Sequence, residues 1–379
     1  TIIGGTVCNV HLVDVYFNST GSQLGGIAGY IYYQGVLRNC SAEGVIIGTS
    51  DVGGIAGDNR NLVEGCGFDG YVTGSGSGSN VGGVVGYNDR TIQNCFNLGA
   101  VTTTSYADIG GITGYNGGSI YNCFNMGSVT SPADPGSIAG NSDIYNLRNC
   151  YYLIGTAPDG VGTSYYESPE DRLGYVEAKT AEQFSGGEVA YLLQVNQTEQ
   201  VWGQNIDNGG EAQAWPVYSN AVVYRGYQGC TQVYSNTVQT VTEPTHSFDG
   251  NGFCTACDRG YEPAQLVDGS YQIKNAGNLY WFAAVVKEGY EGTARNSYAN
   301  AVLTADILVN EQVLTDGVLS ADCSDFRVWT PIGENDAYRG TFDGQGHTIS
   351  GLYISGSDTE VGLFGTVDGQ GMNSRDTGT

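Results

Sequence analysis

Residues 25–30 read Gly25-Gly26-Ile27-Ala28-Gly29-Tyr30, and close copies of this hexapeptide return along the first 150 residues. Successive copies start 28, 29, 28 and 26 residues apart. Self-similarity at a near-constant period indicates a repeat architecture, in which each repeat is one structural unit stacked on the next. The further copies are GGIAGD at 53–58, GGVVGY at 82–87, GGITGY at 110–115 and a degraded GSIAGN at 136–141.

Between these copies the sequence is rich in β-formers and broken by turn residues, with no sustained period of 3.6. Three short strands with their turns add up to roughly 27 residues, which fits one coil of a parallel β-helix. The sequence therefore predicts a mainly β protein, with a parallel β-helix that we expect to be right-handed. Equivalent residues of neighbouring coils would stack ~4.8 Å apart, so one apolar column inside the coils would contain Ile27, Ile55, Val84, Ile112 and Ile138.

A cysteine keeps step with the repeat, and most copies have asparagine before it. We interpret this column as small buried hydrophobic residues, since free cysteine is among the most buried residue types. Disulfides between coils are the alternative, because a ~4.8 Å Cα separation lies in the permitted range, although parallel side chains rarely reach the required dihedral. A metal ladder is disfavoured because no histidine or carboxylate lies in register. The cysteines are Cys40, Cys66, Cys95, Cys123 and Cys150.

The combined pattern, GGIxGY followed by NCFNxGxV, resembles the GLUG repeat of large bacterial surface and secreted proteins, and the resemblance covers residues 1–150. It implies an extracellular or cell-surface β-helix and transfers no catalytic residue. Some relatives are the non-catalytic part of secreted peptidases. A zinc peptidase would need a His-Glu-x-x-His helix, and none of His11, His246 and His347 begins that motif.

The composition narrows the possible partners. The 379 residues include 14 basic and 39 acidic side chains, which gives a net charge of −25. Such an acidic surface repels nucleic-acid phosphates and anionic lipids. The sequence also contains no run of ~18 apolar residues, which is the length needed to span a bilayer. We therefore expect no nucleic acid and no membrane insertion.

The chain beyond the repeats is divided by sequence into further modules. After the β-helix of 1–152 we expect an α+β capping or linking module at 153–222, a small Cys/His module at 223–262 and the helix-capped first coils of a second β-helix at 263–379. Thr180 and Gln183 fit a capping box, so helices are expected over 181–194, split by Gly186-Gly187 and sealing the end of the β-helix. Another short amphipathic helix is expected over 275–286.

A possible ligand cluster lies in the Cys/His module. Cys254 and Cys257 form a Cys-x-x-Cys pair, which can place two thiolates on one zinc ion. Cys230 and His246 would complete a Cys₃His set, with an irregular spacing. A structural zinc, a disulfide and free thiols all remain open, and each would be structural, because a small module with little core needs a staple.

The two ends of the chain suggest a continuation. Residues 362–365 read as the apolar string of a first coil, whereas residues 1–15 read as strands that follow such a coil. The chain would then be cut from a longer array of like modules, or its copies would stack head to tail, as heterologous contacts allow. The expected partners are accordingly neighbouring modules or further copies of this chain.

We expect a non-enzymatic extracellular structural or adhesive module. The alternative is a glycan-binding module that uses an exposed ladder of Tyr30, Tyr87 and Tyr115, although these rings could also pack on one another. A polysaccharide lyase or hydrolase would need two carboxylates facing one cleft. The acids among the coils fall in different phases of the repeat, and they are Asp51, Asp58, Asp69, Asp89 and Asp108.

Overall fold

The computed structural model describes residues 1–163, 175–257, 260–334, 337–356 and 360–368. They form two compact units, one of Thr1–Arg225 with Tyr234–Gln239 and the other of Gly226–Val233 with Thr240–Thr379. The four-module division made from the sequence stays a prediction.

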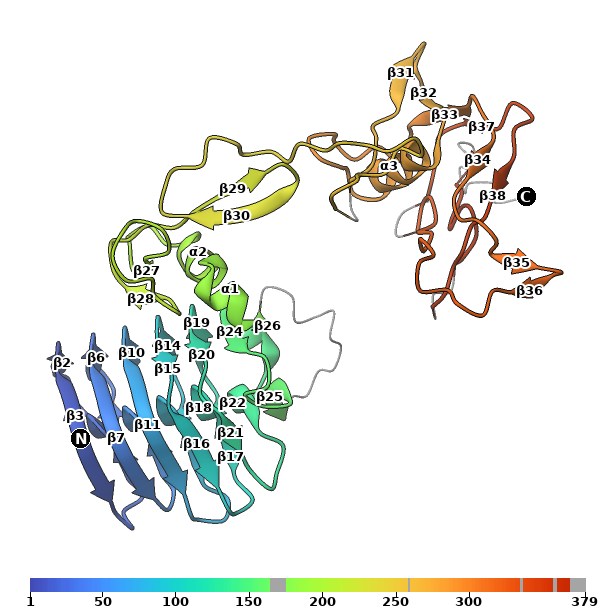
Figure 1. The fold of residues 1–379 in the computed structure, drawn as a ribbon. Helices are drawn as coiled ribbons and strands as arrows, with labels where there is room; N and C mark the ends of the chain where they lie inside the picture. Colours follow the sequence, from blue (N-terminus) through green and yellow to red (C-terminus); the bar gives the residue numbers. More distant parts are fainter. Residues whose placement is uncertain (164–174, 258–259, 335–336, 357–359, 369–379) are drawn as a thin grey trace, which may run out of the picture. The chain divides into compact units, whose positions relative to one another are not determined.

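The first unit is a parallel β-solenoid, as the repeat predicts, and its strands stack in successive coils (Figure 1). Three sheets form the solenoid. The smallest has six parallel strands, which are β2 (Thr6–Cys8), β6 (Val36–Arg38), β10 (Leu62–Glu64), β14 (Thr91–Gln93), β19 (Ser119–Tyr121) and β23 (Leu147–Arg148).

The two other sheets complete the coils. The nine-stranded sheet contains β3 (His11–Asn18), β7 (Ser41–Gly48), β11 (Gly67–Gly74), β15 (Phe96–Asn97), β16 (Ala100–Thr103), β20 (Phe124–Asn125), β21 (Val129–Thr130), β24 (Cys150–Leu153) and β26 (Val176–Lys179). The eleven-stranded sheet contains β1 (Ile2–Ile3), β4 (Gln23–Gly25), β5 (Ala28–Tyr32), β8 (Asp51–Gly53), β9 (Ala56–Asn59), β12 (Asn80–Gly82), β13 (Val85–Asn88), β17 (Asp108–Gly110), β18 (Thr113–Asn116), β22 (Gly136–Ser142) and β25 (Asp159–Thr163).

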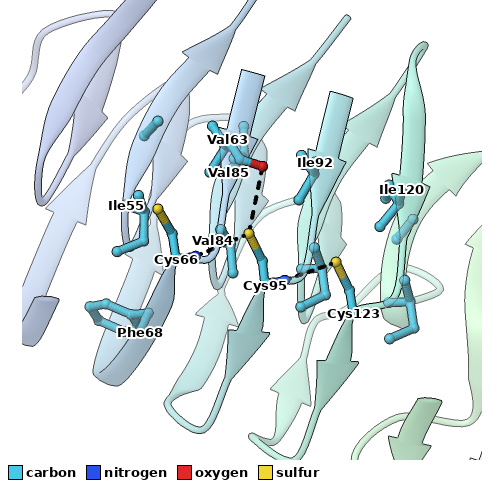
Figure 2. Packing of buried hydrophobic residues seen from close by; sticks show 14 of the residues in the cluster. Ile55, Val63, Cys66, Phe68, Val84, Val85, Ile92, Cys95, Ile120 and Cys123 are labelled. Atoms are coloured by element: carbon cyan, nitrogen blue, oxygen red, sulfur yellow. Dashed lines mark hydrogen bonds between the residues drawn. The ribbon is translucent and has the colours of Figure 1, made fainter. Parts of the chain in front are cut away.

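Pairing in register places like residues in columns inside the coils. Val63 pairs with Ile92, and Ile92 pairs with Ile120. The expected apolar column is confirmed, because Ile55, Val84, Ile112 and Ile138 are fully buried and Ile27 packs at its end. Figure 2 shows part of this core together with the cysteine column beside it.

The residue before each column cysteine forms a corner of the coil in the left-handed region. Asn39, Asn94, Asn122 and Asn149 have φ between 51° and 54°, and Gly65 has φ 62°. Asparagine and glycine are the residue types that enter this region at least cost. This explains why glycine stands at position 65, where the other copies carry asparagine.

The column thiols are free and buried, as the favoured interpretation predicts. Each thiol donates a hydrogen bond to the carbonyl two residues earlier, at 3.2 to 3.4 Å. The Cys95 and Cys66 amides in turn donate to the sulfur one coil away, Cys123 and Cys95 respectively. The cysteines thereby satisfy polar backbone groups at the corner as well as filling the core.

Buried amides form a second ladder across the coils. Asn59 donates to Asn88 at 2.7 Å, Asn88 donates to Asn116 at 2.7 Å, and Asn116 donates to the hydroxyl of Ser142 at 3.0 Å. A buried amide costs free energy unless its hydrogen bonds are made. Because each amide bonds the equivalent residue of the next coil, stacking and polar satisfaction are achieved together.

The parallel pairing runs further than the repeat strings do. Strand β25 pairs with β22, and β26 pairs with β24, so coil geometry continues to Lys179. The sequence missed this because residues 151–179 lack the glycine and cysteine signals. The short 3₁₀ helix η1 (Ile144–Asn146) lies between β22 and β23.

Two short helices follow, α1 (Ala181–Ser185) and α2 (Glu188–Gln194). The capping box of Thr180 and Gln183 is confirmed, and Gly187 at φ 89° separates the helices. Phe184 packs with Phe124 and Tyr151, whose side chains point outward from β20 and β24. The helices therefore cover an aromatic side face of the solenoid, which corrects the expectation that they seal its end.

The segment after α2 packs on the same aromatic face. Strand β27 (Trp202–Gly203) pairs antiparallel with β28 (Val217–Tyr218). The buried Trp202 ring lies 5.5 Å from the Phe124 ring, and its indole N–H donates to the Asn94 side chain at 3.2 Å. A two-stranded sheet of β29 (Tyr224–Gln228) and β30 (Thr231–Ser235) follows in the chain.

The second unit also contains stacked parallel strands, as expected for the opening of a second β-helix. Strands β32, β33 and β37 pair in parallel, β34 pairs with β38, and Ile332 forms a parallel bridge with Phe364. Its elements are β31 (Gln265–Val267), β32 (Ser270–Ile273), α3 (Ala276–Lys287), β33 (Asn300–Leu303), β34 (Ile307–Leu308), β35 (Leu314–Thr315), β36 (Val318–Leu319), β37 (Phe342–Asp343) and β38 (Ile349–Ser350).

Helix α3 lies where the sequence places it, with Asn275 as the N-cap that accepts a hydrogen bond from the Asn278 amide. It is not amphipathic, however, because residues 276–283, 285 and 286 are all buried. A helix that is apolar on all sides belongs to a core, and α3 is the centre of the core of its unit. Among the residues described, no helix combines the length and apolar character needed to span a bilayer.

We predict different outcomes for two substitutions at the Asn39 corner. Valine should lower the free energy of unfolding of the solenoid by ~1–2 kcal/mol, because a β-branched residue is strained at positive φ. Glycine should leave it nearly unchanged, as Gly65 does one coil later. Chemical unfolding of both variants measures the difference, and equal stabilities would contradict the role assigned to the corner.

Candidate metal centre

The site lies in the second unit, where residues 246–257 and Gly260 form a knuckle. An antiparallel bridge joins Phe248 to Cys254, and the Cys254 amide donates to the Gly260 carbonyl at 2.8 Å. The Ala256 amide points back to the Cys254 sulfur at 3.4 Å. A side chain at Gly260 would collide with the His246 ring, so only glycine permits this close approach.

The knuckle and Cys230 bring four ligand atoms together. One atom each from Cys230, His246, Cys254 and Cys257 lies within 4.8 Å of all the others. The sulfurs of Cys230 and Cys254 are 3.7 Å apart, and the Cys257 sulfur is 3.5 Å from Nδ1 of His246. All four residues that the sequence singled out therefore meet at one point.

These separations can be compared with a tetrahedral zinc site. With Zn–S near 2.3 Å and Zn–N near 2.0–2.1 Å, the edges of the tetrahedron are about 3.8 Å between sulfurs and about 3.6 Å between sulfur and nitrogen. The observed 3.7 and 3.5 Å match both edges. The residue types and the spacing thus fit one zinc ion at the centre of the cluster.

The outer nitrogen of His246 has a carboxylate partner. Nε2 of His246 lies 2.8 Å from Oε1 of Glu291, and the side chain of His246 is 7 % exposed. A histidine that binds a metal through one nitrogen usually donates the other N–H to a carboxylate, which fixes the ring. Glu291 provides such a carboxylate from a backbone with φ 38°, and the Phe248 ring stacks on His246.

The surroundings of the thiols in the cluster give them different pKa values. Burial alone raises the pKa of Cys254, but the Ala256 amide and His246 outweigh it and lower that pKa to about 6. Cys230 behaves oppositely, since its hydrogen bond with Cys257 and its desolvation raise its pKa to about 11. Desolvation lowers the pKa of His246, but Cys254 and Glu291 together raise it above its ordinary value.

Sequence reasoning missed Glu291. It lies in a turn bounded by Gly289 and Gly292, far along the chain from Cys257 and in no recognisable motif. The other two histidines bond to residues outside the cluster. His11 pairs with Ser41 at 2.8 Å, and His347 pairs with Asp306 at 3.3 Å.

The tyrosine column packs on itself over part of its length. The rings of Tyr87 and Tyr115 stack with centroids 4.9 Å apart. Asp58 takes the place of tyrosine in the coil before Tyr87, and Arg60, bound to Asp58 at 2.8 Å, lies 4.6 Å from the centre of the Tyr87 ring. The Arg60 guanidinium thus continues the stack by a cation–π contact, and Tyr30 is separated from the other two rings.

The acids among the coils are not all in different phases, which corrects the sequence analysis. Asp51 and Asp108 both pair with Asn80, from opposite sides, and so lie in one column two coils apart. Burial is the largest influence on both carboxyl groups and raises their pKa values. Asn80 donates to Asp51 at 2.7 Å and Asn141 donates to Asp108 at 3.4 Å, so each acid is part of the stacking between coils.

Comparison with known proteins supports the repeat assignment. The family model described as the GLUG motif matches residues 20–47, which contain the first hexapeptide and the first column cysteine. No curated protein sequence matches the chain. The structure is similar to a crystal structure of a candidate immunoglobulin A1 protease from Bacteroides ovatus, with 22 % identity and a TM-score of 0.41 over 57 % of this chain and 69 % of that one.

We predict that, in the metal-free chain, Cys254 is alkylated faster than Cys230. At pH 7 a thiol with a pKa of about 6 is mostly thiolate, whereas Cys230 with a pKa of about 11 is protonated. The rate at Cys254 should rise with pH through about 6 and then level off. Iodoacetamide labelling of chelator-treated protein, followed by peptide mass spectrometry, measures both sites.

The labelling experiment has two controls, a buried thiol of the same chain and a variant of His246. Burial raises the pKa of Cys95 far above its usual range, so this thiol should stay unlabelled in the folded chain. The His246→Ala variant should shift the Cys254 profile to higher pH, because it removes one of the interactions that lower the pKa. Equal labelling of Cys254 and Cys230 at pH 7 would contradict the assignment.

Proposed function

We propose that this chain is a non-enzymatic structural and adhesive part of an extracellular or cell-surface protein. The observation that carries the proposal is the use of the repeated polar positions. Asn59, Asn88 and Asn116 bond one another from coil to coil, and Asp51 bonds Asn80. Hydrogen bonds between the side chains of neighbouring coils hold the coils together and make the solenoid a stiff rod.

Two further features support an extracytoplasmic role. The GLUG motif is associated, by the resemblance described above, with bacterial surface and secreted proteins, and the family model matches residues 20–47. The net charge of −25 keeps such a rod soluble and apart from nucleic acid and anionic membranes. Head-to-tail assembly with further copies stays a prediction.

We further propose that Cys230, His246, Cys254 and Cys257 bind one structural zinc ion in the second unit. The support is the match of two separations to the edges of a tetrahedron, together with the Glu291 carboxylate behind His246. A disulfide would use two sulfurs and give no purpose to the histidine and its carboxylate. The zinc would tie Cys230 to the knuckle.

The adhesive function is tested with the full chain coated on beads. Beads are layered on surfaces that carry mucin or cell-wall polysaccharide and then washed under flow. Adhesion should saturate with the density of the chain, and the polysaccharide should remain intact by chromatography. Absence of adhesion on every surface, or shortening of the polysaccharide, would refute the proposal.

We predict about one zinc per chain by elemental analysis of protein purified without added metal. Cys257→Ser and His246→Ala should lose the metal, and the melting temperature of the second unit should fall with them. Glu291→Gln should weaken zinc binding ~10- to 100-fold, as expected for a partner of a ligating histidine. Zinc competition with a chromophoric chelator gives the affinity.

The matched control is Cys323→Ser, which changes a free thiol of the same unit outside the cluster. This variant should keep its zinc and its melting temperature. A chain that carries no zinc, and in which mass spectrometry finds a disulfide between Cys230 and Cys254, would overturn the zinc assignment.

A further inference from the structure

A groove of about 860 Å³ lies within the first unit, between the asparagine corners of the solenoid and residues 199–220. It extends from the coil of Asn9 to the coil of Asn94, three strand-to-strand steps or roughly 14 Å. Its volume falls in the ~300–1,000 Å³ range of ligand sites. The first unit alone forms this groove, and no side chain of the candidate zinc centre lines it.

The groove has one fixed aromatic wall. The Tyr218 hydroxyl is anchored to the solenoid, donating to the Asn94 carbonyl at 2.7 Å and lying 3.4 Å from the Cys66 carbonyl. Its ring lies 4.7 Å from the Trp202 ring and 5.6 Å from the Phe96 ring, yet Tyr218 remains 40 % exposed. Anchoring a tyrosine hydroxyl while leaving part of its ring in a groove creates a rigid platform.

The groove is also lined by polar groups with both donors and acceptors. Arg38 pairs with Glu64 at 2.6 Å, and their side chains are 49 % and 22 % exposed. His11 forms a hydrogen bond with Ser41 at 2.8 Å. Asn39, which lies between Arg38 and Ser41 in the sequence, is exposed and also lines the groove. These groups come from successive coils, so they are distributed along the groove.

A sugar chain has the chemistry that this arrangement recognises. Each pyranose presents an apolar C–H face that packs on an aromatic ring, and hydroxyl groups that both donate and accept hydrogen bonds. The groove carries one net negative charge, because Arg38 is accompanied by Glu64 and Glu199. With a net charge of −25 on the chain, an anionic sugar would be repelled.

We propose that this groove binds a neutral oligosaccharide of a few sugar units, with Tyr218 as the stacking platform and Arg38, Glu64 and Asn39 as hydrogen-bonding partners. The inference deepens the adhesive role proposed above and rests on it. It moves glycan recognition from the tyrosine column, where Tyr87 and Tyr115 cover each other, to a site that the repeats form together with the segment that follows them.

The test is calorimetric titration of the full chain with cello-, xylo-, manno- and galacto-hexaoses, and with a hexagalacturonate as the charged comparison. At least one neutral hexaose should bind, and the uronate should bind at least about 10-fold more weakly than it does. No binding by any neutral hexaose, or preference for the uronate, overturns the proposal.

Two variants locate the site. Tyr218→Ala and Arg38→Ala should each weaken binding of that hexaose by about 10-fold or more. Arg38→Ala guards against a folding defect, because Arg38 is exposed and Glu64 keeps its hydrogen bond from Gln93. Tyr106→Ala is the matched control, since Tyr106 is 74 % exposed and does not line the groove. Unchanged affinity in both groove variants, with normal circular dichroism, overturns the assignment.

The same variants separate this inference from the proposed function. If coated beads adhere and Tyr218→Ala beads adhere equally well, the groove assignment fails and the adhesive role stands. If no beads adhere, the adhesive role fails. Shortened hexaose in the titration cell would overturn both, because the groove would then be a hydrolytic site.

Discussion

The structure of the first unit depends on backbone pairing in register between successive coils. Each coil cannot bury its own apolar face, so its stability comes from the coils above and below it. In-register pairing fixes which side chains meet, and every position of the repeat becomes a column. The positive-φ corners at Asn39, Asn94 and Asn122 keep that register, because each corner turns the chain at the same point of the coil.

The same pairing decides the chemistry of the cysteines. In the column, a thiol is enclosed by its neighbours and bonds a carbonyl, so burial raises the pKa of Cys95 and Cys123 and makes them structural. In the knuckle of the second unit, the Ala256 amide and His246 lower the pKa of Cys254. The residue type alone therefore does not predict the pKa of a thiol. The nearby hydrogen-bond donors and charges determine which thiol ionises readily enough to become a metal ligand.

The non-repetitive segments give each unit its distinctive surface. Repeats alone would present the same corner again and again along the rod. Residues 199–220 break that uniformity by anchoring Trp202 and Tyr218 on Asn94, and the groove exists only because this segment crosses the corners. In the second unit, the turn at Glu291 likewise completes a site whose other members lie in an earlier stretch of chain.

The amino-acid order alone indicated the solenoid, the Ile55–Val84–Ile112 column, the capping box at Thr180 and the four residues of the candidate zinc centre, because these follow from the repeat period and from the residue types present. It did not determine where α1 and α2 pack, the burial of α3 on all sides, the role of Glu291, or the groove at Tyr218. Each of these depends on contacts between segments distant along the chain. Such contacts leave no periodic trace in the sequence, so only the packed structure reveals them.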